Sequence, residues 1–315
     1  MAKKKITILV SIFFVIFLTL IIFHKTENNV VEVIIPKGSS PKAIATILKD
    51  SKLIYSEKVF IVLIKTFNYS KKLKAGAYEF KTKDNVFKII LKIKNGENSN
   101  IKLTIPEGFD IKKIGNILEE KGICKSENFI KIATEKKMEG FLFPDTYFIV
   151  PSSSEIDIIN MMNDEFNKSF TKDMKERCKQ LNMSVYDIIT LASIVEKEAV
   201  SPKERPMIAA IFLNRLKKKM KLESCATVLY GLGINKERLS FEDLKFESEY
   251  NTYKYHGLPP GPICNPGIKS IEAVLYPATT DNLFFVSKGN GTHFFSSTFN
   301  EHVKNKIASK KKAKQ

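Results

Sequence analysis

An internal repeat constrains the fold of this chain more than any other feature of its sequence. The pattern Ile-Pro-x-Gly at Ile35–Gly38 recurs 70 residues later at Ile105–Gly108. The apolar positions of Ile44–Leu48 recur in the same register at Ile114–Leu118, and a Ser-Glu pair follows each of these segments. A register that holds over so many positions indicates two copies of one structural unit.

Each copy has the same predicted order of elements. An alternating strand (VEVII or IKLTI) turns at Pro-x-Gly, an amphipathic helix follows, a second helix starts at the Ser-Glu pair, and a second strand ends the unit. We therefore predict two small βααβ-type modules, at residues 31–95 and 101–165. Modules of this shape serve as carbohydrate-binding units or as spacers, and the sequence leaves both open.

An uncharged apolar segment, Ile6–Phe23, precedes the repeat. Its 18 residues are just enough to cross the hydrocarbon core of a bilayer as a helix. Lys3–Lys5 precedes the segment, so the positive-inside tendency places residues 1–5 in the cytoplasm and everything after Lys25 outside. We predict an uncleaved single-pass anchor and a linker at 24–30. A cleaved signal peptide is the alternative, but no small-x-small cleavage site follows.

The chain is strongly basic, with 51 Lys and Arg against 34 Asp and Glu and a formal net charge of +17. Such an excess suggests a polyanionic neighbour, either nucleic acid, an anionic membrane surface or an acidic wall polymer. A lysine-rich solvated surface explains it equally. No nucleic-acid recognition motif concentrates the charge, and an external location weakens that interpretation, so nucleic acid is not an expected partner. Residues 306–315 are predicted to be a basic tail.

The four cysteines are far apart and form no Cys-x-x-Cys pair, so a structural zinc site is not expected. Two disulfides or isolated buried thiols both remain open.

The segment Ile188–Val200 predicts a helix that carries a glutamate into apolar surroundings. At about 100° per residue, Leu191 and Ile194 fall within roughly 60° of Glu198, whereas Glu196 falls about 160° away. Apolar surroundings disfavour the charged form of a carboxyl group and raise its pKa, which prepares it to act as a general acid near neutral pH. A glutamate that simply reaches water near a helix end is the alternative.

Two features downstream of this helix indicate a groove. Ser201–Glu204 reads as a capping box with proline at the first helical position, so Glu198 is expected just before a tight turn into the next helix. Four prolines between Pro259 and Pro266 exclude regular helix or central strand and predict a stiff loop. Aromatic and amide side chains beside that loop suit sugar recognition, although a structural turn would have the same composition.

A hairpin is predicted near the C-terminus. Leu283–Val286 and Thr292–Ser296 flank Asn290-Gly291, a strong hairpin signal. His293 would lie on its second strand among phenylalanines, either as a hydrogen-bonded core residue or as part of the site.

Six ordered motifs together resemble one known family. They are MEGFLFPDTY (Met138–Tyr147), LASIVEKEA (Leu191–Ala199), IAAIFLNRLKKKMKLES (Ile208–Ser224), TVLYG (Thr227–Gly231), YNTYKYHGLPPGPICNPG (Tyr250–Gly267) and GNGTHFFS (Gly289–Ser296). In this order they are similar to the MltG/YceG-type endolytic murein transglycosylases, over nearly the whole chain. One departure is Cys225-Ala226, where the family usually has an acidic residue and proline.

The resemblance implies an α+β protein with an N-terminal transmembrane helix, a LysM-like first module and a mixed α+β catalytic domain at 166–305. It implies a bacterial lyase that cuts peptidoglycan glycan strands and needs neither metal nor cofactor. The essential glutamate would be Glu198. Candidates for binding the substrate are Asn251, Tyr253, Thr227, Tyr230, Gly261, Asn290 and His293.

The expected location is the cell membrane (the inner one if an outer one exists), with the catalytic region outside the cytoplasm and peptidoglycan synthases as possible partners. Three other functions remain open. A non-enzymatic wall-binding or division scaffold would not use Glu198. A two-carboxylate hydrolase would need a partner such as Asp145 or Glu223. A metallopeptidase is the weakest, because no His-Glu-x-x-His occurs.

Overall fold

The computed structural model describes residues 29–36, 38–151, 153–234, 236 and 239–312. Its helices and short two-stranded sheets confirm the predicted α+β class. The chain divides into two compact units, of which unit 1 comprises Met1–Lys102 and Phe148–Ser152 and unit 2 comprises Leu103–Tyr147 and Ser153–Gln315. The predicted boundary between a second module and a catalytic domain, at 165/166, stays a prediction.

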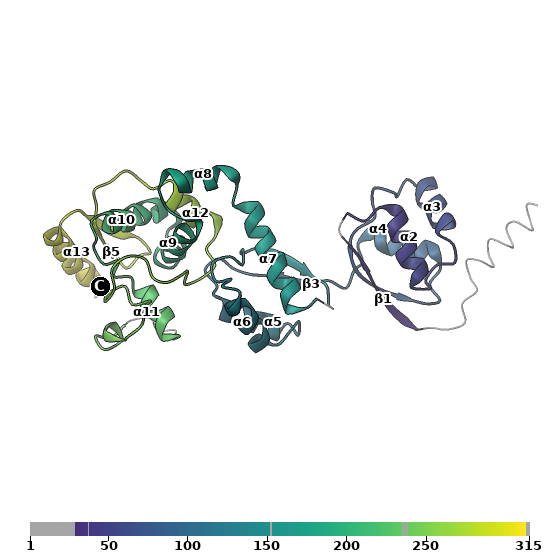
Figure 1. The fold of residues 1–315 in the computed structure, drawn as a ribbon, viewed down its shortest axis with the longest axis horizontal. Helices are drawn as coiled ribbons and strands as arrows, with labels where there is room; N and C mark the ends of the chain where they lie inside the picture. Colours follow the sequence, from purple (N-terminus) through teal and green to yellow (C-terminus); the bar gives the residue numbers. More distant parts are fainter. Residues whose placement is uncertain (1–28, 37, 152, 235, 237–238, 313–315) are drawn as a thin grey trace, which may run out of the picture. The chain divides into compact units, whose positions relative to one another are not determined.

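Within the described residues, unit 1 contains a two-stranded sheet and three helices (Figure 1). Its elements are β1 (Val30–Ile35), α2 (Pro41–Asp50), α3 (Glu57–Thr66), β2 (Gly76–Lys81) and α4 (Val86–Asn95). β1 pairs antiparallel with β2 from Val30–Lys81 to Ile35–Gly76. Alternate residues of β1, Val33 and Ile35, are buried with the apolar sides of the helices, as expected of strands with one covered face.

Local capping explains where the helices of unit 1 begin. The side chains of Ser40, Ser56 and Asn85 each accept a hydrogen bond from the backbone N–H three residues on, which satisfies one of the free donors of a helix start. Gly96, with a left-handed backbone, ends α4.

The next segment repeats the order of elements seen in unit 1. In both, the order is strand, helix, helix, strand, helix. It contains β3 (Ile101–Thr104), α5 (Ile111–Glu120), α6 (Ser126–Glu135), β4 (Thr146–Ile149) and α7 (Glu155–Ser169). β3 and β4 form a second two-stranded sheet.

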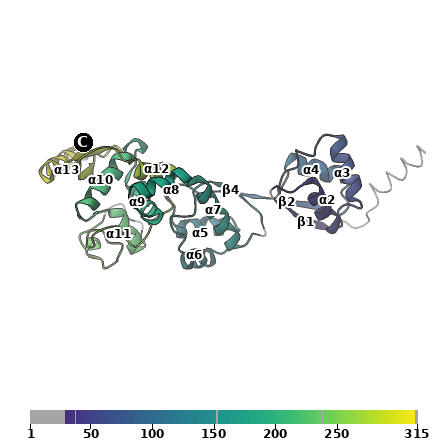
Figure 2. The same ribbon diagram turned by 45° about the horizontal axis from the view of Figure 1, so that its top comes forward.

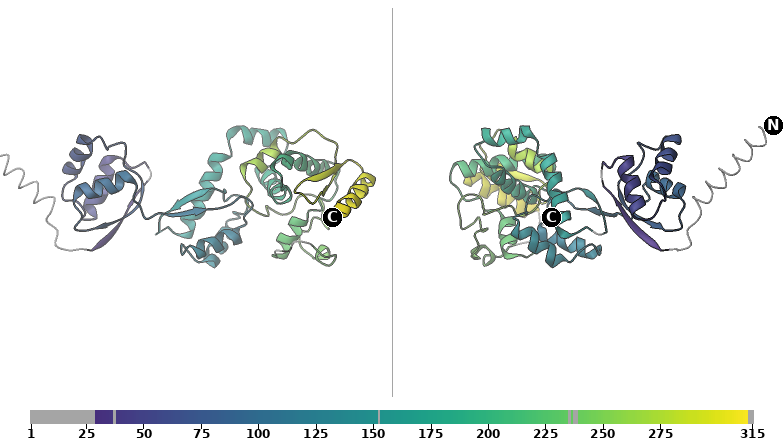
Figure 3. Two further views of the ribbon diagram at one scale, coloured as in Figure 1. Left: turned by 180° about the vertical axis from the view of Figure 1, so that it is seen from behind. Right: turned by 45° about the vertical axis from the view of Figure 1, so that its right-hand side comes forward.

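The rest of unit 2 is built around α9. Its elements are α8 (Lys172–Gln180), α9 (Val185–Glu198), η1 (Pro202–Glu204), α10 (Arg205–Lys217), α11 (Cys225–Leu232), η2 (Asp243–Lys245), α12 (Ile268–Leu275), β5 (Phe284–Ser287), β6 (His293–Ser296) and α13 (Phe299–Lys312). Helices α8, α10, α11 and α12 contact α9 (Figure 2). β5 and β6 form the predicted antiparallel hairpin, and α13 lies beside it (Figure 3).

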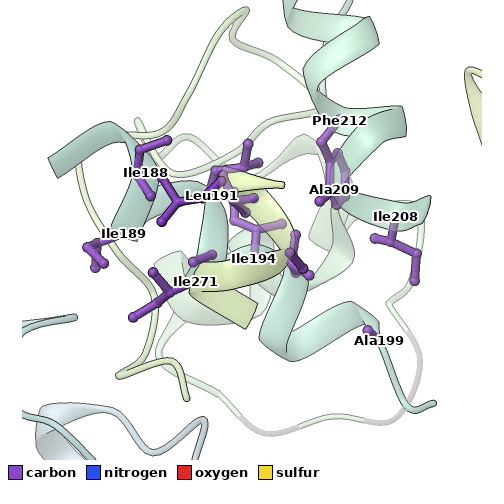
Figure 4. Close-up of a cluster of buried hydrophobic side chains, with 14 of the residues drawn as sticks. Ile188, Ile189, Leu191, Ile194, Ala199, Ile208, Ala209, Phe212 and Ile271 are labelled. Atoms are coloured by element: carbon purple, nitrogen blue, oxygen red, sulfur yellow. The ribbon is translucent and has the colours of Figure 1, made fainter. Parts of the chain in front are cut away.

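Helix α9 is enclosed by apolar side chains over most of its length. All residues from Ile188 to Val195 are buried, in a cluster that includes Phe212 of α10 and Ile271 of α12 (Figure 4). A helix that is apolar on all sides is stable only inside a core, which explains the central place of α9.

The start of α9 is as its sequence indicates, whereas the start of the next helix is not. Ser184 and Asp187 form a reciprocal capping box. The capping box predicted at Ser201 is wrong, because the Ser201 side chain makes no capping bond and α10 begins only at Arg205, after the short η1 turn. The carboxylate of Glu204 instead accepts hydrogen bonds from His293, so it is not free to close a box.

The predicted anchor at 6–23 lies outside the described residues. Among the residues that are described, no helix combines the length and apolar character needed to span a bilayer. The four cysteines are free thiols, of which Cys178 and Cys264 are buried and Cys225 is exposed.

Candidate active site

Unit 2 contains a cavity of about 780 Å³ at the C-terminal end of α9. Its volume lies in the range typical of sites for small molecules and oligomer segments. Its wall includes the start of α5, helix α6 with the segment that follows it, both ends of α9, helix α11 and the proline-rich loop. Its lining includes Glu139, Glu198, Cys225, Tyr230, Tyr250 and Pro262.

Glu198 is the last residue of α9 and is partly exposed where it lines the cavity. The Ser224 hydroxyl donates a hydrogen bond to its Oε1 over 2.5 Å, and the N–H of Ala226 donates another. Burial of this carboxyl raises its pKa above the ordinary value, although both donors and the nearby His293 pull the other way. The direction matches the expectation from the helix pattern, because a raised pKa favours the protonated form that a general acid needs.

Glu196 has a different environment on the other side of the helix. Its carboxylate accepts hydrogen bonds from the Arg205 guanidinium over 2.8 Å and from the N–H of Gly267 over 3.0 Å. It does not line the cavity. With a buried guanidinium and a backbone N–H as its partners, and with no place in the cavity wall, Glu196 has a structural role.

Ser224 was not singled out by the sequence, and two threonines hold it in place. Its N–H donates to Thr252 Oγ1 over 3.0 Å, and its carbonyl accepts from the Thr227 hydroxyl over 2.8 Å. The two threonine hydroxyls also contact each other at 2.8 Å. Thr227, predicted to touch substrate, is fully buried, and its contacts are with this frame. Ser224 is the last residue of the motif Ile208–Ser224, three residues before Thr227, and this motif is the signal that could have found it.

Asn251 and Tyr253 lie next to this frame. The Asn251 side-chain amide donates to the carbonyls of Leu244 and Phe246, both over 2.9 Å, and its oxygen accepts from the N–H of Tyr253. These hydrogen bonds stabilise the loop from Leu244 to Tyr253. The Tyr253 hydroxyl lies 3.2 Å from Cys225 Sγ, and its pKa is raised by burial and by nearby Glu198, so this side chain is close to the acid.

The other predicted contact residues are distributed as follows. Tyr230 lines the cavity, and its ring packs against that of Tyr250 with centroids 4.9 Å apart. Gly261 is buried in the proline-rich loop, where a Cβ would collide with the Tyr186 hydroxyl. Asn290 is exposed in the hairpin turn, where its side chain accepts from Thr292.

His293 is buried on β6. Its Nδ1 lies 2.7 Å from the Glu204 carboxylate, and its backbone N–H donates to the same group over 3.1 Å. From this position His293 acts to lower the pKa of Glu198 by electrostatic attraction. A direct contact with substrate stays a prediction for His293, as for the other six candidate residues.

Two rival candidates for a second carboxylate are away from the cavity. Asp145 and Glu223 are both exposed and do not line it, and Glu223 instead pairs with Arg215. Two carboxyl groups share the cavity with Glu198, those of Asp110 and Glu139, and the sequence did not predict a role for either.

Comparisons with known proteins cover most of the chain. The endolytic murein transglycosylase of Bacillus subtilis (strain 168) is 37% identical over 310 residues, which is 90% of this chain and 86% of that protein. The protein of the same name from Streptococcus pneumoniae serotype 2 is 29% identical over 322 residues, and the match covers 89% of this chain and 58% of that longer protein. The crystal structure of a yceG-like protein from Listeria monocytogenes is similar with a TM-score of 0.61 and 35% identity, covering 88% of this chain and 99% of the other.

A family model described as YceG-like matches residues 33–308, which extend over most of both units and contain the residues of the site. With this match and the Bacillus relative, the chain belongs to the YceG-like family.

Proposed function

We propose that this protein is a lytic transglycosylase of peptidoglycan. It cleaves the β-1,4 bond from N-acetylmuramic acid to N-acetylglucosamine within glycan strands and leaves 1,6-anhydro ends, which terminates strand elongation. Membership of the YceG-like family and relatives that carry the name endolytic murein transglycosylase support this function. The observation that carries it is the carboxyl of Glu198, which lines a cavity and has a raised pKa.

The reaction needs one carboxyl group in two successive roles. Protonated Glu198 gives its proton to the glycosidic oxygen as the bond from that oxygen to the anomeric carbon of the muramic acid breaks. The N-acetyl group of the substrate stabilises the positive charge that develops on this carbon. The Glu198 carboxylate then takes the proton of the muramic C6 hydroxyl, whose oxygen attacks the anomeric carbon. The ring closes, Glu198 is protonated again, and no water is consumed.

The neighbours of Glu198 fit these two roles. The bonds from Ser224 and Ala226 fix the orientation of the carboxyl and stabilise its charged form after the first step. Burial makes the charged form costly, so the carboxylate readily recovers a proton in the second step. A non-enzymatic scaffold would give no reason to place an acid with these properties in a cavity.

The finer parts of the proposal concern the N-terminal region. Residues 6–23 anchor the chain in the cell membrane with the catalytic part on the external face, where peptidoglycan synthases are its neighbours. The uncharged run and the lysines before it support this arrangement. The first module, 31–95, is LysM-like and binds or spaces glycan.

Mass spectrometry of digested glycan strands tests the function. The truncated chain Asn28–Gln315 should convert purified strands into fragments with anhydro ends at internal positions. Glu198→Gln should lose at least about 1,000-fold in rate, because the amide has no proton to donate, while Glu196→Gln, the matched change on the other side of α9, should keep most of the activity. Reducing ends would mean hydrolysis instead, and full activity of Glu198→Gln would refute the proposal.

A further inference from the structure

Glu139 lines the same cavity as Glu198 and takes no part in the proposed step. We infer that Glu139 is a positioning residue, which holds the ring of Tyr230 as the surface on which the sugar lies. The inference rests on the proposed function for the identity of the ligand, a glycan of alternating N-acetylhexosamines.

The carboxylate of Glu139 joins three distant parts of the chain. The N–H of Ile111, at the start of α5, donates to both of its oxygens over 3.3 and 3.2 Å. The Asn265 side-chain amide donates to Oε1 over 3.2 Å, and the Tyr230 hydroxyl donates to Oε2 over 3.1 Å. These three donors approach the carboxylate from different parts of the chain, so it has little freedom to rotate. The Tyr230 hydroxyl therefore has a partner in a fixed position.

The backbone at Glu139 is fixed independently of its carboxyl group. Gly140 has a φ of +87°, and a Cβ there would lie 2.5 Å from Pro262 and 2.8 Å from Ile189. The Asn265 side chain also accepts from the N–H of Leu142 over 2.8 Å and donates to the carbonyl of Phe109 over 2.9 Å. Without the carboxylate this segment therefore keeps its packing and its other hydrogen bonds. Variants at Glu139 are expected to fold and can be assayed.

Tyr230 depends on Glu139 more than the rest of the segment does. In the described part of the chain, the Tyr230 hydroxyl donates its hydrogen bond to Glu139. Burial raises the pKa of Glu139 to about 8. Because a tyrosine hydroxyl can donate to a carboxylate or accept from a carboxylic acid, the bond survives in both protonation states. Glu139 can therefore keep its hydrogen bond to Tyr230 at pH values on both sides of neutrality.

The ring that Glu139 holds is a suitable surface for a sugar. Tyr230 and Tyr250 pack at 4.9 Å with a tilt of 51°, and both line the cavity with Glu198. An aromatic ring offers an apolar face to the C–H side of a pyranose and keeps a polar edge for hydrogen bonding. The tilt of Tyr230 therefore decides the height and angle at which the glycan lies relative to the acid.

A double-mutant cycle tests the inference with Glu139→Leu, Tyr230→Phe and the double variant. Leucine is used because glutamine could still hydrogen-bond the Tyr230 hydroxyl. Tyr230→Phe deletes the bond from the other side and keeps the ring, so it covers the case in which Glu139→Leu fails to fold. Each single change should raise KM for glycan strands about 3- to 10-fold with kcat within about twofold, as expected for one lost hydrogen bond. The double variant should be no worse than the worse single one, because both changes remove the same interaction.

Additive effects in the cycle, an unchanged KM, or an equal loss of kcat in both variants would overturn the inference. Glu196→Leu is the matched control, a carboxyl bonded to other groups and away from the cavity. A similar rise of KM in this control would show a general loss of stability and would also overturn it.

A binding measurement separates the inference from the proposed function. Calorimetric titration with a tetrasaccharide of N-acetylglucosamine and N-acetylmuramic acid, in the Glu198→Gln background, should show the same 3- to 10-fold weakening and the same non-additivity. If the wild type fails to cleave strands but this pattern appears, the proposed reaction is wrong and the role of Glu139 stands. Cleavage by the wild type without the pattern leaves the reaction intact and refutes the role.

Discussion

The two glutamates at the end of α9 show how position alone divides chemistry from structure. Glu198 lines the cavity and is held by a hydroxyl and a backbone N–H, whereas Glu196 is paired with a guanidinium. Both belong to the same helical turn. The difference follows from the helical period, which turns them to opposite sides of one helix.

Ser224 gives a direct test of the acid's environment. Its hydrogen bond favours the charged form of Glu198, so Ser224→Ala should raise the pKa of this carboxyl further. The reaction starts from protonated Glu198, so kcat/KM falls as pH rises through that pKa, and the alkaline limb of the pH profile should move to higher pH in the variant. The maximum rate should fall about 10-fold, because one bond that orients the acid is lost.

The pH profile of kcat/KM on soluble glycan strands checks this prediction, with Thr227→Ser, which keeps the hydroxyl near Ser224, as the conservative control. An alkaline limb that moves to lower pH would contradict the role given to Ser224.

At the scale of elements, local sequence signals determine where helices begin when their side chains have no stronger partner. Ser184 and Asp187 make the box at α9 that the sequence predicts. Ser201 and Glu204 have the same pattern, but Glu204 pairs with buried His293, and no box forms. The contact of Glu204 with buried His293, which is distant in sequence, thus forms in place of the local capping box with Ser201.

The capping box of α9 should stabilise unit 2 measurably. Ser184→Ala removes an N-cap and should cost about 1 kcal/mol, which lowers Tm by roughly 2–4 °C in a unit of this size. Differential scanning calorimetry measures it. Ser154→Ala at the equivalent box of α7 is the matched comparison and should cost a similar amount. No change of Tm in Ser184→Ala would mean that core packing alone sets the register of α9.

Most elements and the acid itself could be predicted from local sequence, whereas the surroundings of the acid could not. The period of α9 selects Glu198, and Asn290-Gly291 marks the hairpin. Glu139 was missed because its partners lie 28, 91 and 126 residues away along the chain, and no local period records such contacts. Thr227 illustrates the converse, since a motif identifies it but only packing shows that it supports Ser224.

At the scale of the whole molecule, an enzyme that cuts strands as they are made needs to stay near the membrane surface. The apolar run at 6–23 and the first strand at Val30 are separated by few residues, which would keep unit 1 close to the bilayer.

Removal of the anchor should separate location from catalysis. The full chain should remain with the membrane fraction after a high-salt wash, which releases proteins bound by charge alone. The chain Asn28–Gln315 should be found in the soluble fraction and cleave isolated strands at the wild-type rate. Release of the full chain by salt would show that its charge of +17, rather than an anchor, holds it at the membrane.

The enclosure of α9 has a consequence for how the reaction is approached. From Ile188 to Val195 the helix has no face that could slide or rotate without opening the core around it. The proton donor is therefore stationary, and the polymer has to travel and distort to meet it. Turnover would then be governed by how readily a newly made strand can be drawn in and bent, so the stiffness of the wall polymer becomes part of the kinetics.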